Sequence, residues 1–292
     1  MLGPTASGKT EVAIRLAEHF GAEIISVDSM QVYRGMDIGT AKPTILERRG
    51  VPHHMVDVAE PEEEFSVARF RVLGRGILEE RDAPVMIITG GSGLHFRALV
   101  DPMSFAPTNS ETRAELEGRD PGSMVEELLA ADPGAGSHVD LANSRRVIRA
   151  MEIYLLTGET PSSRAGSAQA EEVRRYVAEI EFEAVGVDPG GDLDDRVERR
   201  LVSMRDGGLV DEVRSLAPRL GRTARNAVGY REILEALAGE TSIDDAFELA
   251  AAATKKLARK QRTWFQRDPR IRWIPWIEDV EQRTGRILET FT

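Results

Sequence analysis

The first ten residues contain a motif that can bind phosphate. Gly3, Gly8, Lys9 and Thr10 match every fixed position of the pattern G-x-x-x-x-G-K-[ST]. In such a loop the glycines let backbone N–H groups converge on phosphate oxygens, and the helix that follows adds a favourable dipole. The lysine reaches a terminal phosphate, and the hydroxyl of Thr10 is placed to hold Mg²⁺. The sequence therefore predicts a phosphate loop, with Mg²⁺ as cofactor, formed by Gly3, Pro4, Thr5, Ala6, Ser7, Gly8, Lys9 and Thr10.

The carboxylate that usually accompanies such a loop is missing from its usual place. Phosphate-loop enzymes that use nucleoside triphosphates place an acid after a hydrophobic strand, where it holds the magnesium and its water shell. The most apolar candidate strand ends in Thr89-Gly90-Gly91-Ser92, and the only carboxylate that leaves a candidate core strand is Asp28. This weakens the ATPase and kinase interpretations, and a diphosphate leaving group suits the loop as well as a triphosphate does.

Asp28 has two interpretations from the residues alone. It could cap a turn after its strand, or it could serve as a general base. Because the carboxyl ends of parallel strands face the ligand crevice, we expect Asp28 to share one cleft with the phosphate loop.

The elements that must position these residues alternate between helix and strand. Residues 9–20 form an amphipathic pattern, 22–28 and 84–89 are short apolar runs, and a helix is expected from Ser66 after a long loop over 29–64. This order predicts an α/β fold with a P-loop NTPase-like parallel sheet core. A phosphate loop normally follows a strand, and only Met1 and Leu2 precede this one, so we expect the natural first strand to begin before Met1.

The pattern changes after about residue 105. Residues 110–158 show helical segments and no strand, residues 180–184 alternate as a strand, and residues 193–265 are nearly all helical. We therefore predict a core formed by residues 1–108 and 178–292 with helices in its C-terminal part, interrupted by a helical insertion at 109–177.

Composition excludes several classes of protein. The 292 residues include no cysteine, 41% are hydrophobic and the net charge is −11, which excludes a disulfide scaffold, thiol catalysis and whole-chain disorder. No apolar run is long enough to span a bilayer, so we expect no membrane association and a cytoplasmic protein.

Although the chain as a whole is acidic, residues 255–272 hold eight Lys or Arg and one acid. This segment, together with a smaller patch at Arg145, Arg146 and Arg149, is either a solvated surface or a phosphate-binding one.

Eight stretches of the chain together resemble one enzyme family. They are Gly3–Thr10, Ser26–Tyr33, Gly35–Pro43, His53–Asp57, Gly90–Leu94, Arg145–Glu152, Val228–Glu232 and Arg259–Trp264. Their order and residues resemble the tRNA dimethylallyltransferases, also called isopentenyl-tRNA transferases. Asp-Ser-Met-Gln and Gly-Thr-Ala-Lys-Pro are far more specific than the phosphate loop.

The resemblance implies transfer of a dimethylallyl group from dimethylallyl diphosphate to N6 of the adenosine on the 3′ side of the tRNA anticodon (position 37). It implies that the phosphate loop and Arg225 bind the diphosphate, that Asp28 is the catalytic base, and that Ser92 replaces a family threonine at the reacting centre. The residues implied to contact the tRNA anticodon stem-loop are Asp28, Ser29, Met30, Gln31, Ser92, Arg113, Arg145, Arg146, Arg149, Tyr230, Arg231, Arg259, Lys260 and Arg262.

Three other functions remain open at this point. Prenylation of free adenine nucleotides would use the same chemistry, but a helical insertion and basic C-terminal helices favour a macromolecular acceptor. A phosphate-loop kinase would consume ATP, and a non-catalytic RNA-binding module would not need Asp28 beside the loop. We expect the enzyme to act as a monomer.

Overall fold

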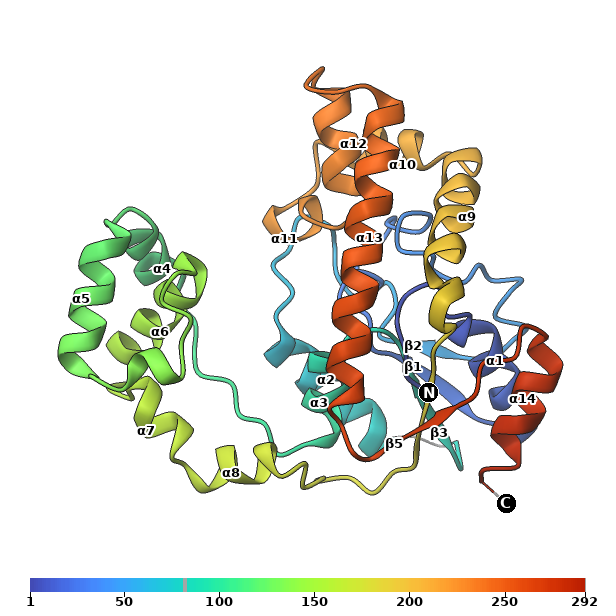
Figure 1. Ribbon diagram of the computed structural model, residues 1–292, viewed down its shortest axis with the longest axis horizontal. Coiled ribbons are helices and arrows are strands. Elements are labelled where there is room, and N and C mark those ends of the chain that lie inside the picture. The colour runs from blue at the N-terminus through green and yellow to red at the C-terminus, as the bar shows by residue number, and fades with distance from the viewer. Residues whose placement is uncertain (81–82, 292) are drawn as a thin grey trace. The chain divides into compact units, whose positions relative to one another are not determined.

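The computed structural model describes residues 1–80 and 83–291, which form two compact units. Unit 1 comprises Met1–Val100 and Glu181–Thr292, and unit 2 comprises Asp101–Ile180. Figure 1 shows the course of the chain, with unit 2 drawn in green to yellow-green. The predicted insertion at 109–177 falls inside unit 2, which also includes the segments that enter and leave it.

The strands of unit 1 are short and all pair in parallel. β1 (Glu23–Ser26) lies between β2 (His53–His54) and β3 (Met86–Thr89), and β4 (Ala184–Val187) pairs with β5 (Ile271–Ile274). Leu2 makes parallel bridges to Gly90, just after β3, and to Gly186 in β4. This single residue therefore connects the three-stranded and two-stranded sheets, and the phosphate loop starts directly after it.

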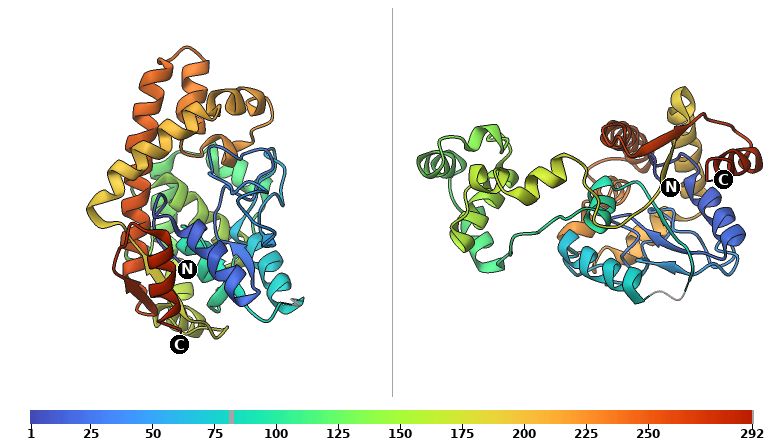
Figure 2. Two further views of the ribbon diagram at one scale, coloured as in Figure 1. Left: turned by 90° about the vertical axis from the view of Figure 1, so that its right-hand side faces the viewer. Right: turned by 90° about the horizontal axis from the view of Figure 1, so that it is seen from below.

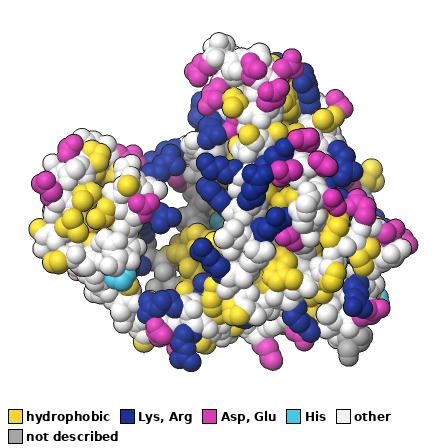
Figure 3. Space-filling model, in the orientation of Figure 1, with side chains coloured by type: hydrophobic (Ala, Val, Ile, Leu, Met, Phe, Trp, Pro, Cys, Tyr) yellow, Lys and Arg dark blue, Asp and Glu magenta, His cyan; other side chains and the backbone are white. Residues whose placement is uncertain are grey.

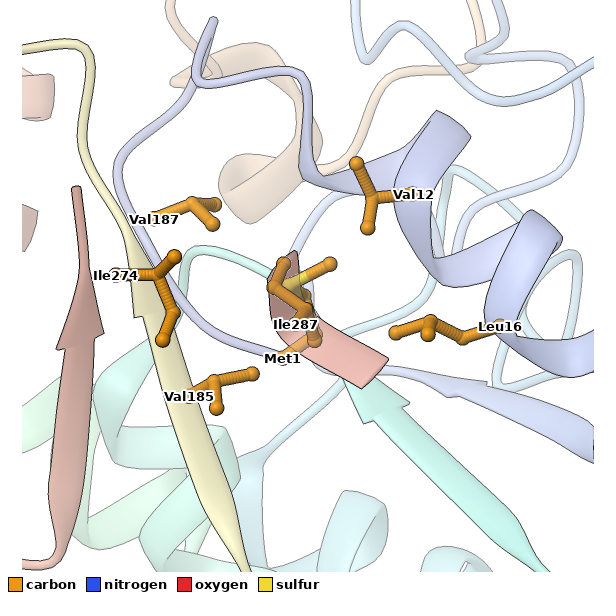
Figure 4. Close-up of a cluster of buried hydrophobic side chains, with 7 residues drawn as sticks. All are labelled: Met1, Val12, Leu16, Val185, Val187, Ile274 and Ile287. Atoms are coloured by element: carbon orange, nitrogen blue, oxygen red, sulfur yellow. The ribbon is translucent and has the colours of Figure 1, made fainter. Parts of the chain in front are cut away.

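Helices at the two ends of the chain pack together beside the sheet. α1 (Lys9–Phe20) contacts α14 (Val280–Leu288), and the views in Figure 2 agree in placing them side by side. Figure 4 shows the apolar cluster that joins them to β4 and β5. Its buried members are Met1, Val12, Leu16, Val185, Val187, Ile274 and Ile287.

The remaining helices of unit 1 build the walls around the carboxyl ends of the strands. α2 (Val67–Glu80) packs on α3 (Gly93–Val100), and the 24-residue helix α13 (Ile243–Gln266) packs on α9 (Leu193–Asp206) and α12 (Tyr230–Leu237). The short helices η2 (Gly190–Asp192), α10 (Leu209–Leu216) and α11 (Arg222–Arg225) complete this part.

Unit 2 is helical and has a core of its own. Its helices are α4 (Ser110–Glu117), α5 (Pro121–Ala131), η1 (Ala135–Ser137), α6 (Ser144–Thr157), α7 (Pro161–Ala165) and α8 (Ala168–Arg174). Asn109, Asp120 and Asn143 each accept a backbone N–H at a helix start, which fixes where α4, α5 and α6 begin. The buried cluster contains Leu116, Met124, Leu128, Ala135, Val147, Ala150 and Met151.

Four local expectations differ from the structure. The predicted loop at 29–64 contains β2, and the strand expected at 180–184 instead occupies Ala184–Val187. β5 and α14 were not anticipated, so the C-terminal part is not purely helical.

Among the described residues, no helix combines the length and apolar character needed to cross a bilayer.

Candidate active site

The phosphate loop has the backbone geometry of an anion site. Gly3 cannot carry a side chain, because an added Cβ would lie 2.2 Å from the carbonyl oxygen of Val187. Ala6 and Gly8 both have left-handed backbones, with φ of 60° and 72°, which is uncommon for alanine. Gly8 caps α1, and it has no side chain that could accept the N–H groups at this helix end. These donors are therefore available to a phosphate.

Lys9 is the cation of this loop, and its side chain is half-buried. Its Nζ donates to the carbonyl oxygen of Pro4 at 3.1 Å. Burial lowers the pKa of Lys9 to about 8, the nearby Arg200 lowers it as well, and Asp28 acts in the opposite direction. The group is still mainly protonated at pH 7, and a phosphate oxygen would replace the carbonyl as its partner.

The structure brings Asp28 and the phosphate loop into one cavity. A small cavity of about 40 Å³ is lined by Thr5, Lys9, Thr10 and Asp28, among others. Asp28 also lines a neighbouring cavity of about 90 Å³, whose walls include Met30, Met204 and Leu257. A phosphate site, a carboxylate and apolar side chains thus meet at the carboxyl end of β1.

The turn after β1 aims the carboxylate of Asp28. Its Oδ1 accepts the backbone N–H of Met30 at 2.8 Å and of Gln31 at 3.3 Å. One oxygen is thereby fixed by the backbone, whereas Oδ2 makes no hydrogen bond among those found for the described residues. Asp28 therefore closes a turn and also lines the cavity, and its role as a general base stays a prediction.

Arg200 is a site residue that the sequence reasoning missed. It lines both small cavities and also a larger cleft of about 710 Å³ that contains Lys9, Thr10 and Arg196. Burial lowers the pKa of Arg200, and the charge of Asp28 opposes that shift. Arg196, one helical turn earlier in α9, donates through Nε to the carbonyl oxygen of Ala6 at 2.8 Å. The sequence feature that could have identified these residues is the spacing of Arg196 and Arg200, which are four residues apart and so lie on one face of α9.

The prediction that Arg225 binds the diphosphate is corrected by its position. Arg225 ends α11 with an exposed side chain, and its Nη2 donates to the carbonyl oxygen of Ala217 at 3.3 Å. Among the described residues that line the three cavities, Arg225 is absent and Arg200 is present in all. Arg200 on α9, rather than Arg225 on α11, is therefore the arginine that lies beside the phosphate loop.

Ser92 sits in the turn between β3 and α3, beside a histidine that was also missed. Its backbone N–H donates to the carbonyl oxygen of Val27 at 3.0 Å, and its Oγ lies 2.7 Å from Nδ1 of His95. Burial lowers the pKa of His95 to about 4, with Asp28 acting in the opposite direction. His95 is thus neutral at pH 7. The sequence feature that could have identified His95 is its position three residues after Ser92, on the same helical face.

Side chains of α10 and α12 contact the loop that contains Gly39 and hold its backbone. Glu212 accepts the backbone N–H groups of Asp37, Ile38 and Gly39 at 3.0, 2.7 and 3.0 Å. The hydroxyl of Tyr230 donates to the same carboxylate, and an added Cβ on Gly39 would lie 2.3 Å from the Tyr230 ring. Tyr230 is fully buried. It therefore supports this loop, which corrects its assignment to direct tRNA contact.

The Asp-Ser-Met-Gln stretch is tied to the same loop. Ser26 donates to Oε1 of Gln31 at 2.8 Å, and Nε2 of Gln31 donates to the carbonyl oxygen of Thr40 at 3.2 Å. Ser29 and Met30 are half-buried next to them. Gln31 is thus oriented by the protein and also lines the cavity with Asp28, and Ser29 and Met30 retain accessible surface.

Two side chains of helix α13, Gln261 and Trp264, contact the loops that form the site. Oε1 of Gln261 accepts the backbone N–H of Thr5 at 2.8 Å, and Gln261 packs on Gly91. Trp264 packs so tightly that a Cβ on Gly93 would lie 2.0 Å from its ring. The motif Arg259–Trp264 therefore joins α13 to the phosphate loop and to the glycine-rich turn after β3.

The cations of α13 divide into paired and unpaired groups. Arg259 binds Asp194 and Arg262 binds Asp188, each at 2.6 Å, so both help to hold α9 and the segment before it. Lys256 and Lys260 are exposed, and no acid of the described residues lies within ion-pair distance of either. Figure 3 shows Lys and Arg side chains gathered over α13. Arg231, on α12, is exposed and pairs with Glu232.

In unit 2, two of the predicted arginines lie beside a buried acid and two are exposed. Glu152 is fully buried, and it accepts from Arg149 at 2.7 Å with Arg113 at 3.8 Å. Arg149 also donates to the carbonyl oxygens of Ala106 and Pro107. Arg113 and Arg149 therefore have structural partners. Arg145 and Arg146 are exposed at the start of α6 and line a groove of about 800 Å³ within this unit.

The chain matches known proteins over most of its length. A family model described as IPP transferase matches residues 31–268. A tRNA dimethylallyltransferase of Bifidobacterium longum is 43% identical over 94% of this chain and 85% of its own length. One of Acidothermus cellulolyticus is 42% identical over 99% of this chain and 92% of its own length.

Solved structures agree with these matches. A tRNA isopentenylpyrophosphate transferase of Bacillus halodurans is 32% identical, with a TM-score of 0.68 over 99% of this chain and 94% of that one. A tRNA delta(2)-isopentenylpyrophosphate transferase of Staphylococcus epidermidis is 31% identical, with a TM-score of 0.70 over 99% of this chain and 96% of that one. With a model match over more than half of the chain and relatives above 40% identity, the chain belongs to the IPP transferase family.

Proposed function

We propose that this protein transfers a dimethylallyl group from dimethylallyl diphosphate to N6 of adenosine 37 of tRNA. The observation that carries the proposal is the cavity shared by the phosphate loop, Asp28 and Arg200. The family membership supports it, since the relatives carry the name tRNA dimethylallyltransferase. The core that supports this cavity is proposed to be a P-loop NTPase-like fold whose loop binds a diphosphate in place of a nucleotide.

The leaving group requires positive charge. An allylic diphosphate breaks its carbon–oxygen bond readily when the departing diphosphate is neutralised, because the allylic carbon tolerates cationic character. Lys9 and Arg200 supply two fixed cations, and the N–H groups of the loop and of α1 supply donors. The five-carbon tail would occupy the cavity walled by Met30, Met204 and Leu257.

Magnesium fits the donors that the structure offers. The Thr10 side chain lines the cleft and the small cavity, and Mg²⁺ prefers oxygen ligands with several retained waters. The described residues contain no group of three or more His, Asp or Glu able to hold a metal by themselves. We propose that Thr10 and the diphosphate oxygens would hold the ion, which would neutralise charge on the leaving group.

The acceptor amine requires a proton acceptor and an orienting group. The lone pair of an adenine amine is delocalised, so alignment matters more than basicity. As the N6–carbon bond forms and the carbon–oxygen bond of the diphosphate breaks, one N6 proton passes to the carboxylate of Asp28. With its proton on Nε2, neutral His95 accepts the hydroxyl hydrogen of Ser92 at Nδ1, which leaves the oxygen of Ser92 free to accept from N6.

The base must leave its stack to reach this cavity, so we propose that adenosine 37 is flipped out of the anticodon loop. Lys256 and Lys260 in unit 1, and Arg145 and Arg146 in unit 2, are the exposed cations proposed to bind tRNA phosphates. One chain supplies the whole cavity, so the active form is proposed to be a monomer that acts on tRNA in the cytoplasm.

The test is mass spectrometry of nucleosides after incubation of the protein with dimethylallyl diphosphate, Mg²⁺ and tRNA. We expect a dimethylallyl adenosine at position 37 and none when that adenosine is replaced by guanosine. Parallel reactions with AMP, ADP and ATP as acceptors test the free-nucleotide alternative. Prenylated nucleotide without prenylated tRNA would overturn the proposal.

A further inference from the structure

Arg283 is a buried cation without a counter-ion. Its side chain is 3% exposed, and neither Nε nor Nη1 has a hydrogen-bond partner among the described residues. No carboxylate described in the structure lies within ion-pair distance of it. Removing a guanidinium from water without such a partner is expensive, so a protein keeps one only where something else compensates.

The immediate neighbours of Arg283 provide only part of that compensation. Its guanidinium carbon lies 4.1 Å from the centre of the Trp276 ring, and that of Arg196 lies 4.8 Å from the same ring. Burial lowers the pKa of Arg283, and Arg196 lowers it further. Glu278 and Asp279 oppose this shift. However, Glu278 pairs with Arg196 at 3.0 Å, so its charge is already matched by Arg196, and the two guanidiniums lie over one indole.

Both cations lie against the phosphate loop. A Cβ built on Gly8 would lie 3.2 Å from Nη2 of Arg196 and 3.5 Å from Nη2 of Arg283. Gly8 is the residue that caps α1, and it has no side chain that could accept the N–H groups of the first turn. The guanidinium of Arg283 therefore lies against the residue of the phosphate loop at which α1 begins.

The helix that carries Arg283 is firmly fixed. Ile287, one turn later in α14, is fully buried with Val12 and Leu16 of α1 in the cluster of Figure 4. Since α1 begins at the phosphate loop, α14 holds Arg283 at a constant distance from that loop. A mobile surface cation would be screened and would adapt, whereas this one keeps its position and its charge.

We propose that Arg283 is a positioning residue for the diphosphate: a fixed, uncompensated cation behind Gly8 that strengthens anion binding at the phosphate loop. This inference rests on the proposed function. The counter-charge that the empty protein lacks is supplied by the bound diphosphate. The empty protein consequently loses stability to keep this charge buried, and the complex regains it.

The test compares Arg283→Met with the parent. Methionine is shorter than arginine, but it keeps an unbranched apolar stem that can contact Trp276, and it removes the charge. Titration calorimetry with inorganic diphosphate and Mg²⁺ should show affinity about tenfold weaker, and thermal unfolding without ligand should show equal or higher stability. Arg283→Lys should retain most of the affinity, because it keeps the charge. The matched control is Arg286→Met, which removes an exposed arginine of the same helix, paired with Glu289, and should change neither quantity.

Two outcomes would overturn the inference. Unchanged diphosphate affinity in Arg283→Met, with or without lower stability, would make Arg283 a purely structural residue. If Arg283→Met does not fold, Arg283→Lys decides instead, and a loss of affinity as large as that expected of a neutral residue would argue against a role of charge. A parent that binds diphosphate but does not prenylate tRNA would contradict the proposed function alone.

Discussion

At the scale of single residues, Asp28 both holds a turn and carries the carboxylate proposed as the general base. Its Oδ1 holds the turn through the N–H groups of Met30 and Gln31. In Asp28→Asn the amide oxygen can keep both hydrogen bonds, whereas the proton-accepting carboxylate is lost. We expect turnover to fall on the order of 10²-fold or more with little change in folding. Single-turnover rates check this, with diphosphate affinity and thermal unfolding as controls. A near-normal rate would exclude the base role.

His95 gives a pH-dependent stability that can be measured without substrate. Its pKa is lowered from 6.5 to about 4, chiefly by burial. Between these values the unfolded chain binds a proton that the native protein does not, so stability falls as the pH drops from about 6.5 towards 4. His95→Phe should flatten this part of the profile. Urea unfolding at several pH values is the measurement, and an equally steep profile in the variant would contradict the assignment.

Motifs revealed some of these residues and not others. Asp28 and Ser92 follow strands in specific short patterns, so their places at the carboxyl ends of β1 and β3 were predictable. Arg200 lies within a helix without any motif, and its role depends on how α9 crosses the cleft. The resemblance implies a diphosphate contact for Arg225, but α11 directs its side chain towards the carbonyl oxygen of Ala217. Sequence proximity does not fix the direction of a side chain.

At the scale of elements, the contact between α13 and α3 depends on a missing side chain. A Cβ on Gly93 would lie 2.0 Å from the Trp264 ring. Gly93→Ala should therefore destabilise the protein by about 1–3 kcal/mol through overpacking. Replacing Trp264 by Leu in the same background should recover part of the loss, because the two residues are coupled. Denaturant unfolding of both single variants and the double variant forms the cycle. Additive effects would show that the contact is not tight.

The order of elements was more predictable than their limits. Long periodic helices and apolar strands such as β3 carry their own patterns, and the parallel arrangement follows from their alternation. β5 has four residues with an exposed arginine and a half-buried tryptophan between buried isoleucines, and β2 has two histidines. Both owe their strand conformation to pairing with β4 and β1, which no local pattern records.

At the scale of the whole molecule, an acidic protein must bind a polyanion. The net charge is −11, so tRNA affinity must come from local cations that acids do not neutralise. Lys256→Gln with Lys260→Gln should weaken tRNA binding and flatten its log–log salt dependence by about one unit per lost contact. The control is Arg214→Gln with Arg286→Gln, which makes the same change in net charge at two paired, exposed arginines. Parallel slopes for parent and lysine variant would place α13 away from the RNA.

The site is assembled from distant parts of the chain, and this has a consequence for its synthesis. The phosphate loop lies within the first ten residues, yet Thr5 is held by Gln261 and Gly8 lies against Arg283. A ribosome makes the loop first and these partners last, after the whole of unit 2, whose own core forms from nearby residues. A nascent chain therefore carries the phosphate motif long before it can bind the proposed prenyl diphosphate. Translation of α13 and α14, rather than of the motif itself, sets the moment at which the enzyme can act.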